Sequence, residues 1–216
     1  DWSSDVCSSD LCPWCYIGKR RFEKALEVLR EKGVTEPVEV VWRSFQLDPR
    51  APVGTSSPAI DAYARKFGGP DAAVRIIQNV TDVAAADGIE FRMDIALRAN
   101  TLLAHRALHW ALTEHGAPEQ TVLKERLLRA YFTDGLDVGD ADVLARCADD
   151  VGLDGNALQA WLAAGGGTSA VADDLRAAAE REIDAVPSFV IDGRYLVPGA
   201  QDVDVFVNVF QRVLSR

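Results

Sequence analysis

Two cysteines, Cys12 and Cys15, stand three positions apart with Pro13 and Trp14 between them. Apolar side chains recur at helical spacing through about residues 16–32, so the pair stands at the start of a predicted helix. Main-chain N–H groups in the first turn of a helix have no partner within the helix. A Cys12 thiolate would lie over these groups, and Cys15, one turn further on, is close enough to form a disulfide with it. The pattern predicts thiol–disulfide exchange.

We expect the pKa of Cys12 to be lowered, so that its sulfur is held ionised. Pro13 suits the first helical turn because it has no N–H group and its φ is preset. The dipole at a helix N-terminus stabilises a negative charge there by only about 0.3–2 kcal/mol. A cysteine of such a pair can have a pKa near 3.5, about five units below the free value, which is equivalent to roughly 7 kcal/mol. Hydrogen bonds to the sulfur, from main-chain amides and from the Cys15 thiol, would have to supply the rest.

Two other interpretations of the cysteine pair remain open. A structural zinc site needs four ligands, commonly from two such pairs. Apart from Cys7, only Cys147 and three histidines remain, and they form no second pair at metal spacing. The cysteines could also be two buried structural thiols, but Cys12 precedes a helix and does not belong to an apolar stripe. Redox chemistry is the favoured interpretation.

A second candidate motif is Val186-Pro187, which directly precedes an apolar run. Proline is tolerated at the first residue of a strand or on an edge. A cis bond at this point would turn the chain sharply and leave the Val186 main chain available to an extended peptide. The residues alone do not indicate a cis bond, because only about 5–6% of X-Pro bonds in folded proteins are cis.

The predicted elements follow the order helix, strand, long helical block, strand, strand, helix. The strand covers Val38 to Phe45, and the loop after it covers 48–58. Asp192-Gly193 joins two short strands, 188–191 and 194–197, in a hairpin. The predicted helices after the first are 59–67, 71–87, 100–115, 119–132, 140–151, 155–163, 169–182 and 202–214. The expected buried stripe of the last helix is Val205, Phe206, Val209, Phe210 and Val213.

Residues 1–11 differ in character from the rest of the chain. They contain a near-repeat, Ser3 to Cys7 followed by Ser8 to Cys12, without apolar alternation or helical period. The stretch resembles the in-frame translation of a sequencing-library adapter. We therefore expect 1–11 to be a non-native tail outside the folded domain, and the natural chain to supply one more strand before Cys12.

Composition excludes several classes of function. The 216-residue chain is 48% hydrophobic and 26% charged, which is the balance of a folded globular protein. Its net charge of −10 argues against nucleic acid or an anionic membrane surface as partner, because phosphate binding requires a basic face. No apolar stretch reaches the roughly 18 residues of a membrane span. Four cysteines are too few for a disulfide-built scaffold.

Several segments together resemble the thioredoxin superfamily, in particular the FrnE-like group of DsbA family oxidoreductases. They occur in the order of that family and extend from residue 12 to the C-terminal part of the chain. The matching segments are Cys12–Lys19, Trp42–Pro49, Asn100-Thr101 with Ala104-His105-Arg106, Tyr131-Phe132 and Val186–Gly193. Each motif alone is only moderately specific for the family, but their occurrence together in this order is a strong indication of it.

The resemblance implies an α/β thioredoxin fold with a large all-helical domain inserted between the second strand and the strand after a cis-proline. The thioredoxin-like domain would comprise 12–57 and 184–216, and the inserted domain 58–183. Cys12 would be the nucleophile and Cys15 the resolving thiol, and Pro187 would be cis and face them. Pro13, Trp14 and Val186 would join Pro187 in binding substrate.

The implied activity is thiol–disulfide oxidoreductase action on protein or small-molecule thiols and disulfides. The cysteine pair itself is the redox centre, so we expect no bound cofactor and no metal, with glutathione as a candidate co-substrate. FrnE-like proteins are commonly cytoplasmic, which is the expected location here. The substrate, the redox direction and the oligomeric state are not determined by the sequence.

Two competing functions remain. Glutathione-dependent 2-hydroxychromene-2-carboxylate isomerases and kappa-class transferases have a similar fold, but they use a single Ser or Cys, so Cys15 argues against them. A binding or accessory protein without turnover, or a zinc module, is the other alternative.

The histidines and the remaining cysteine have structural interpretations beside functional ones. His105 and His109, at i and i+4, could hold a metal, but no third ligand is nearby in sequence, so helix packing or cleft lining is favoured. His115 ends a helix, where a cation is favourable. Cys147 lies on an apolar helical stripe and is expected to be buried. Trp14, Phe45, Gln46 and Phe189 are candidates for lining the cleft, with core packing equally open for the two phenylalanines.

Overall fold

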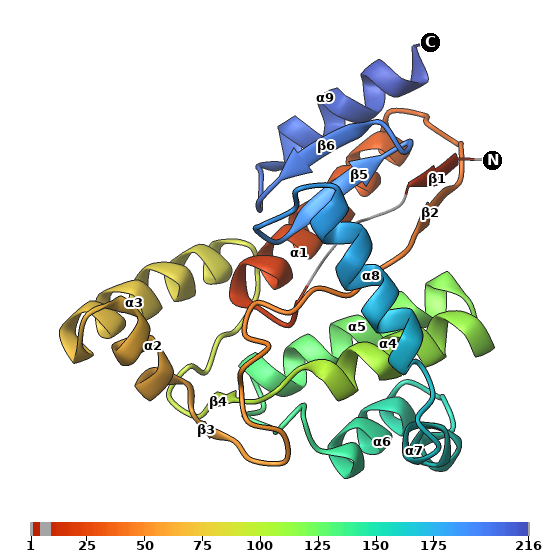
Figure 1. The fold of residues 1–216 in the computed structure, drawn as a ribbon. Helices are drawn as coiled ribbons and strands as arrows, with labels where there is room; N and C mark the ends of the chain where they lie inside the picture. Colours follow the sequence, from red (N-terminus) through yellow and green to blue (C-terminus); the bar gives the residue numbers. More distant parts are fainter. Residues whose placement is uncertain (1, 5–9, 216) are drawn as a thin grey trace.

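The computed structural model describes residues 2–4 and 10–215, and Figure 1 shows their arrangement. Its helices are α1 (Pro13–Glu31), α2 (Ala59–Phe67), α3 (Pro70–Ala86), α4 (Leu102–Glu114), α5 (Ala117–Phe132), α6 (Ala141–Asp150), α7 (Gly155–Ala163), α8 (Thr168–Glu180) and α9 (Val203–Leu214). Its strands are β1 (Trp2–Ser4), β2 (Val38–Val40), β3 (Ser57–Pro58), β4 (Leu97–Arg98), β5 (Ser188–Ile191) and β6 (Tyr195–Pro198). No helix among the described residues is both long and apolar enough to cross a membrane.

The first and last parts of the chain form the thioredoxin-like layer, with both termini at one end of the molecule (Figure 1). Strand β1 pairs in parallel with β2, Trp2 opposite Val38, and also lies beside β5. Strands β5 and β6 form an antiparallel hairpin. Helices α1 and α9 pack together, and the Phe22 ring of α1 lies 5.2 Å from Phe189 and 5.5 Å from Phe206, between ring centroids.

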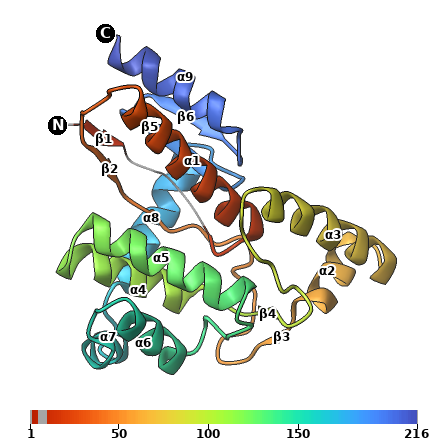
Figure 2. The same ribbon diagram turned by 180° about the vertical axis from the view of Figure 1, so that it is seen from behind.

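The helical block α2–α8 lies between β2 and β5 in the sequence and on the other side of α1 in space (Figure 2). Helices α4 and α5 pack side by side, with α6 and α7 against them, and α8 leads back toward β5. The predicted thioredoxin fold with a helical insertion is confirmed. One addition was not expected, because β3 and β4 pair antiparallel at the base of the α2–α3 hairpin.

Helix α1 belongs to both hydrophobic cores. Its later turns contribute Phe22, Leu26 and Leu29 to the core shared with β5, β6 and α9, as the apolar spacing predicted. Its first turns contribute Tyr16 and Ile17 to the core of the helical block. Helix α1 therefore joins the helical block at its start to the thioredoxin-like layer along its later turns.

The strand predicted over 38–45 ends at Val40, and a side chain explains why. The Trp42 N–H donates to Gln120 Oε1, and Gln120 Nε2 donates to the Trp42 carbonyl, both at 2.9 Å. The Gln120 amide from α5 thus satisfies the main-chain groups that a neighbouring strand would otherwise bond. The helical block replaces strand pairing here.

Other boundaries agree closely with the sequence pattern. The Asp192-Gly193 turn is confirmed, since both residues have positive φ and the Arg194 N–H donates to the Ile191 carbonyl at 3.2 Å, although β6 begins one residue later than predicted. The stripe on α9 is partly wrong. Val205 is 38% exposed and Val207 is buried in its place, while Phe206, Phe210 and Val213 are buried as predicted.

The N-terminal residues were expected to lie outside the folded domain, and for the described part of them this expectation is wrong. Trp2–Ser4 occupy the strand position before the cysteine pair, and Asp10 and Leu11 are buried. Residues 1 and 5–9 lie outside the described residues. The foreign origin of 1–11 stays a prediction.

We predict that replacing residues 1–9 by an apolar, β-branched segment raises the melting temperature by about 5 °C or more. Strands of parallel sheets favour continuous apolar, β-branched residues, whereas Trp2–Ser4 includes two serines. Burying two additional valines contributes about 1.5–3 kcal/mol each, and each kcal/mol shifts Tm by about 2–4 °C at this size. Thermal melts of both proteins followed by circular dichroism provide the measurement, and equal melting temperatures would refute the prediction.

Candidate active site

Cys12 caps the N-terminus of α1. Its backbone is extended, with φ −130° and ψ 155°, and its Sγ accepts a hydrogen bond from the Cys15 N–H at 3.2 Å. Pro13 is the first helical residue. Both thiols are reduced, Cys15 with no exposed surface and Cys12 with 7% exposed. The predicted geometry of a sulfur over the first helical turn is confirmed.

The Val186–Pro187 bond is cis, as the family resemblance implied, and Pro187 lies directly against α1. A Cβ on Gly18 would lie 2.7 Å from Pro187 Cγ and 3.3 Å from Phe189 Cζ. Only a glycine at position 18 lets the proline ring approach the helix one turn after the cysteine pair. Gly18 therefore lets the proline loop pack against α1 one turn after the cysteine pair.

The predicted lowering of the Cys12 pKa is wrong for this reduced geometry. Burial raises the pKa of the Cys12 thiol well above its ordinary value, and the neighbouring Cys15 thiol and the Asp10 charge raise it further. The hydrogen bond from the Cys15 amide opposes these effects but is smaller. Desolvation outweighs the helix terminus because Cys12 is almost completely buried.

Asp10, from the segment set aside in the sequence analysis, is a buried carboxylate two residues before Cys12. It accepts hydrogen bonds from the Leu11 and Leu47 amides, each at 2.8 Å, and lies 3.1 Å from His105 Nε2. Burial opposes its ionisation, but the hydrogen bond and charge of His105 together with the Leu47 amide hold the pKa of Asp10 below its usual value. His105 is thus held by Asp10.

The helical block brings further polar side chains toward the cysteines. Lys124 of α5 is fully buried, and its Nζ donates to the Asp10 carbonyl at 3.3 Å. Burial raises the pKa of Tyr63 in α2 to about 12, and the charge of Cys12 adds to that effect. Burial also raises the pKa of Tyr131, with contributions from Tyr63 and Asp10. Neither Lys124 nor Tyr63 stands in a local sequence motif, so no pattern along the chain identifies them as neighbours of the site.

Ion pairs attach the first turns of α1 to α5. The Lys19 ammonium, 2% exposed, lies 2.6 Å from Glu125 and 2.7 Å from Glu23. The Tyr16 hydroxyl donates to Glu125 at 2.8 Å, and Arg20 pairs with the same carboxylate. These contacts fix the helix start against the inserted block.

The remaining candidates divide between surface and core. Trp14 is 42% exposed beside the cysteines, whereas Phe189 is fully buried core. Phe45 packs against a small cluster with Ala178, and Gln46 donates to Asn100 at 3.3 Å.

The other histidines and Cys147 do not gather at the cysteine pair. The His109 ring lies 6.3 Å from Trp161, and His115 caps the end of α4. Cys147 is fully buried, as predicted. Within residues 2–4 and 10–215, no three His, Cys, Asp or Glu side chains cluster as metal ligands would.

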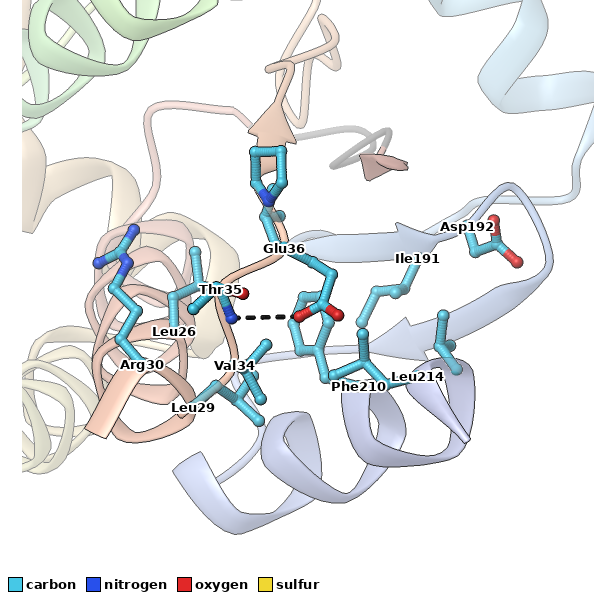
Figure 3. A pocket seen from close by; sticks show the side chains of 13 residues that line it. Leu26, Leu29, Arg30, Val34, Thr35, Glu36, Ile191, Asp192, Phe210 and Leu214 are labelled. Atoms are coloured by element: carbon cyan, nitrogen blue, oxygen red, sulfur yellow. Dashed lines mark hydrogen bonds between the residues drawn. The ribbon is translucent and has the colours of Figure 1, made fainter. Parts of the chain in front are cut away.

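A separate apolar cavity of about 380 Å³ lies at the opposite end of α1 (Figure 3). It is lined by side chains from the end of α1, the loop before β2, β5 and α9, among them Leu29, Val34, Ile191 and Phe210. Its nearest α1 residue, Leu26, is fourteen positions from Cys12, roughly 20 Å along a helix. The cavity is not part of the cysteine site.

The chain matches a known protein family and resembles individual proteins of known sequence or structure. The DSBA-like thioredoxin domain family matches residues 5–211. The protein YwbO of Bacillus subtilis (strain 168) is 31% identical over 207 residues, which cover 93% of this chain and 92% of YwbO. A probable DsbA oxidoreductase from Streptomyces coelicolor has a TM-score of 0.89 at 33% identity, covering 100% of this chain and 91% of that chain.

Two more distant structures share the fold. The cytosolic disulfide reductase DsbM from Pseudomonas aeruginosa, solved with GSH, has a TM-score of 0.65 at 18% identity, covering 100% of this chain and 98% of that chain. A 2-hydroxychromene-2-carboxylate isomerase has a TM-score of 0.66 at 14% identity, covering 99% of this chain and 95% of that chain.

We predict that Gly18→Ala destabilises the protein by about 1–3 kcal/mol, seen as a lower melting temperature. At an open helical position, Gly→Ala would stabilise the protein by about 1 kcal/mol. A loss of stability would therefore be attributable to the contact with Pro187. Lys24→Ala, exposed on the same helix, serves as the control and is expected within about 0.5 kcal/mol of wild type. A melting temperature of Gly18→Ala at or above wild type would contradict the prediction.

We predict that the rate of Cys12 alkylation by iodoacetamide in the reduced protein keeps rising above pH 9.0, the ordinary thiol value. The raised pKa keeps the thiol protonated through neutral pH, and only the thiolate reacts. Peptide mass mapping separates Cys12 from the other cysteines. A rate that levels off below about pH 8 would show a lowered pKa instead.

Proposed function

Because the chain belongs to the DSBA-like thioredoxin domain family, we propose that it is a thiol–disulfide oxidoreductase whose redox centre is Cys12 and Cys15. The observation that carries the proposal is the Cys12 sulfur at the N-terminus of α1, with the Cys15 amide donating to it at 3.2 Å. An attacking sulfur and a second thiol one turn behind it are the two groups that disulfide exchange requires.

In the first step, the Cys12 thiolate attacks one sulfur of a substrate disulfide. A bond forms between Cys12 Sγ and that sulfur, and the other substrate sulfur leaves as a thiolate. Cys12 is suited to this role because it keeps some exposed surface, whereas Cys15 has none. An approaching substrate that displaces the enclosing side chains would also expose the sulfur to the main-chain N–H groups at the helix start.

In the second step, Cys15 attacks Cys12 Sγ in the mixed disulfide. The Cys12–Cys15 disulfide forms, and the second substrate sulfur leaves as a thiolate, so the substrate is reduced and the pair oxidised. The reverse sequence oxidises a substrate dithiol.

Substrate would lie against the exposed Trp14 ring, the Pro13 ring and the main chain at Val186 and Pro187. Trp14 offers a large apolar surface beside the sulfur. Gly18 holds Pro187 close to the same helix turn. An extended peptide pairing with the Val186 main chain would bring its disulfide to Cys12, which favours protein or peptide substrates.

The raised pKa of Cys12 supports the reductive direction. A strongly stabilised thiolate makes the reduced form favourable and its disulfide oxidising. In this protein, burial disfavours the thiolate form of Cys12. The dithiol should therefore be a stronger reductant than a pair whose thiolate is stabilised. Among the structural neighbours, DsbM is described as a cytosolic disulfide reductase. A cytoplasmic location and glutathione as co-substrate are proposals on the same basis.

A glutathione-dependent isomerase is the second candidate, favoured by the shared fold with the 2-hydroxychromene-2-carboxylate isomerase. Such an enzyme needs only one activating side chain, so Cys15 would be dispensable. Glutathione-dependent isomerisation that survives Cys15→Ser would support this candidate over disulfide exchange.

We predict that the protein accelerates reduction of insulin by dithiothreitol, followed as turbidity. Cys12→Ser is expected to abolish the acceleration, because no attacking sulfur remains. Cys15→Ser is expected to lose most of it and to accumulate mixed disulfides at Cys12, visible by mass spectrometry. Cys147→Ser, a thiol distant from the site, is the matched control. Full activity of Cys12→Ser would overturn the proposed function.

A further inference from the structure

The loop between β6 and α9, residues 199–202, holds the main chain where the proposed function places the substrate. The Gly199 N–H donates to the Pro187 carbonyl at 2.7 Å, directly after the last pair of the hairpin, Ser188 opposite Pro198. Pro187 is bonded to Val186, whose main chain is the proposed edge for an extended peptide. A shift of the 199–202 loop would therefore move that edge.

Hydrogen bonds within the 199–202 loop give it a defined shape. Gly199 has a φ of +76°, a left-handed conformation that favours glycine. The Gln201 N–H donates to the Gly199 carbonyl at 3.0 Å, and Gln201 Nε2 donates to the Pro198 carbonyl at 2.7 Å. These bonds are local, so they fix the shape of the loop but not its place relative to α1.

Arg21 of α1 connects the 199–202 loop to the inserted helical block. Its Nη1 donates to the Ala200 carbonyl at 2.9 Å and lies 3.0 Å from the Asp202 carboxylate. Its Nε donates at 2.7 Å to Asp87, the residue that caps the C-terminus of α3. The N–H groups of a guanidinium point in fixed directions. The bond to Asp87 therefore orients Nη1 toward the Ala200 carbonyl.

The exposed fractions indicate which of these contacts matter most. The side chains of Arg21 and Asp87 are 18% and 17% exposed, whereas that of Asp202 is 83% exposed. Ion pairs with strongly exposed partners contribute little. Ala200 also packs against the core of the helical block. The place of the loop is thus set mainly by Arg21, its partner Asp87 and the packing of Ala200.

Arg21 also stands on the face of α1 that meets the proline ring. Gly18, where a Cβ would lie 2.7 Å from Pro187 Cγ, is three residues before Arg21, and residues three apart share one face of a helix. Helix α1 therefore holds the proline loop at two points. One is the direct contact at Gly18, and the other runs from Arg21 through the 199–202 loop to the Pro187 carbonyl.

We propose that Arg21, oriented by Asp87, is a positioning residue for peptide substrates. It holds the 199–202 loop so that Gly199 fixes the Pro187 carbonyl and the Val186 main chain faces an extended peptide. A small disulfide needs only the Cys12 sulfur, so its reaction does not depend on this edge. Through Asp87, the inserted helical block takes part in placing the peptide-binding edge of the thioredoxin-like layer.

Two substrates test the proposal, a short peptide with one internal disulfide and 5,5′-dithiobis(2-nitrobenzoate), in protein carrying Cys7→Ser. We expect Arg21→Met to raise KM for the peptide at least fivefold, with kcat changed less than twofold. Attack of Cys12 on the small disulfide, followed as the first release of nitrothiobenzoate, is expected to stay within twofold of wild type.

Arg126→Met is the matched control. Arg126 also pairs with two carboxylates, those of Asp134 and Asp150, but within the helical block. Its loss is expected to lower the melting temperature and to leave KM for the peptide unchanged. A purely structural role of Arg21 would behave in the same way, because a smaller folded fraction lowers kcat for both substrates and leaves KM as it was.

Arg21→Lys keeps the positive charge beside Asp87 but replaces the guanidinium fork by a single nitrogen. We expect its KM for the peptide to lie between those of wild type and Arg21→Met. An unchanged KM in folded Arg21→Met, or equal slowing of the peptide and the small disulfide, would overturn the proposal.

Hydrogen–deuterium exchange at Gly199, followed by mass spectrometry, gives a readout that does not depend on activity. Exchange is expected to be at least tenfold faster in Arg21→Met than in wild type and unchanged in Arg126→Met. Wild-type exchange in folded Arg21→Met would contradict the proposal even if the protein reduced no peptide. Absence of peptide reduction by the wild-type protein would instead refute the proposed function.

Circular dichroism melts identify any variant that fails to fold. If Arg21→Met does not fold, Arg21→Lys and Gly199→Ala decide. Alanine at a φ of +76° is strained, so Gly199→Ala displaces the same loop while Arg21 stays in place. Both variants are expected to raise KM for the peptide at least threefold, and a wild-type KM in both would overturn the proposal.

Discussion

Helix α1 joins the two hydrophobic cores, and the chemistry of the site depends on the burial of its first residues. Tyr16 and Ile17 anchor its first turns in the helical block, while Phe22 and the turns after it pack against β5 and α9. The capping sulfur lies where little water reaches, because Cys12 is only 7% exposed. The helix still offers its N–H groups to Cys12, but removal of water is the larger effect and favours the neutral thiol.

The helical block contributes to the thioredoxin-like layer through individual polar side chains. Gln120 ends strand β2 by bonding both main-chain groups of Trp42. Glu125, on the same helix, pairs with Lys19 of α1. These contacts give hydrogen-bond partners to polar groups that are buried between the block and the layer. Lys124, four residues after Gln120 on α5, donates to the Asp10 carbonyl two residues before Cys12.

Local patterns predicted most of the elements. Helix spacing, the Asp192-Gly193 turn and the cysteine pair at a helix start each depend on interactions within a few residues, and the structure confirms all three. Predictions that depend on distant groups were less accurate. The end of β2 is set by Gln120, about eighty positions away, and no pattern around Val41 contains that information. Asp10 was set aside because its surrounding residues have no periodicity, yet its contacts with His105 and Leu47 bury it.

The sequence by itself determined which sulfur caps the helix, which thiol stands behind it, and the order in which strands and helices follow. Those properties are short-range, because a helix start and its capping residue are neighbours along the chain. Only the tertiary structure decided the direction of the Cys12 pKa shift and the contact of Lys124 with the Asp10 carbonyl. Desolvation depends on everything that encloses a group in space, including side chains from helices far along the chain.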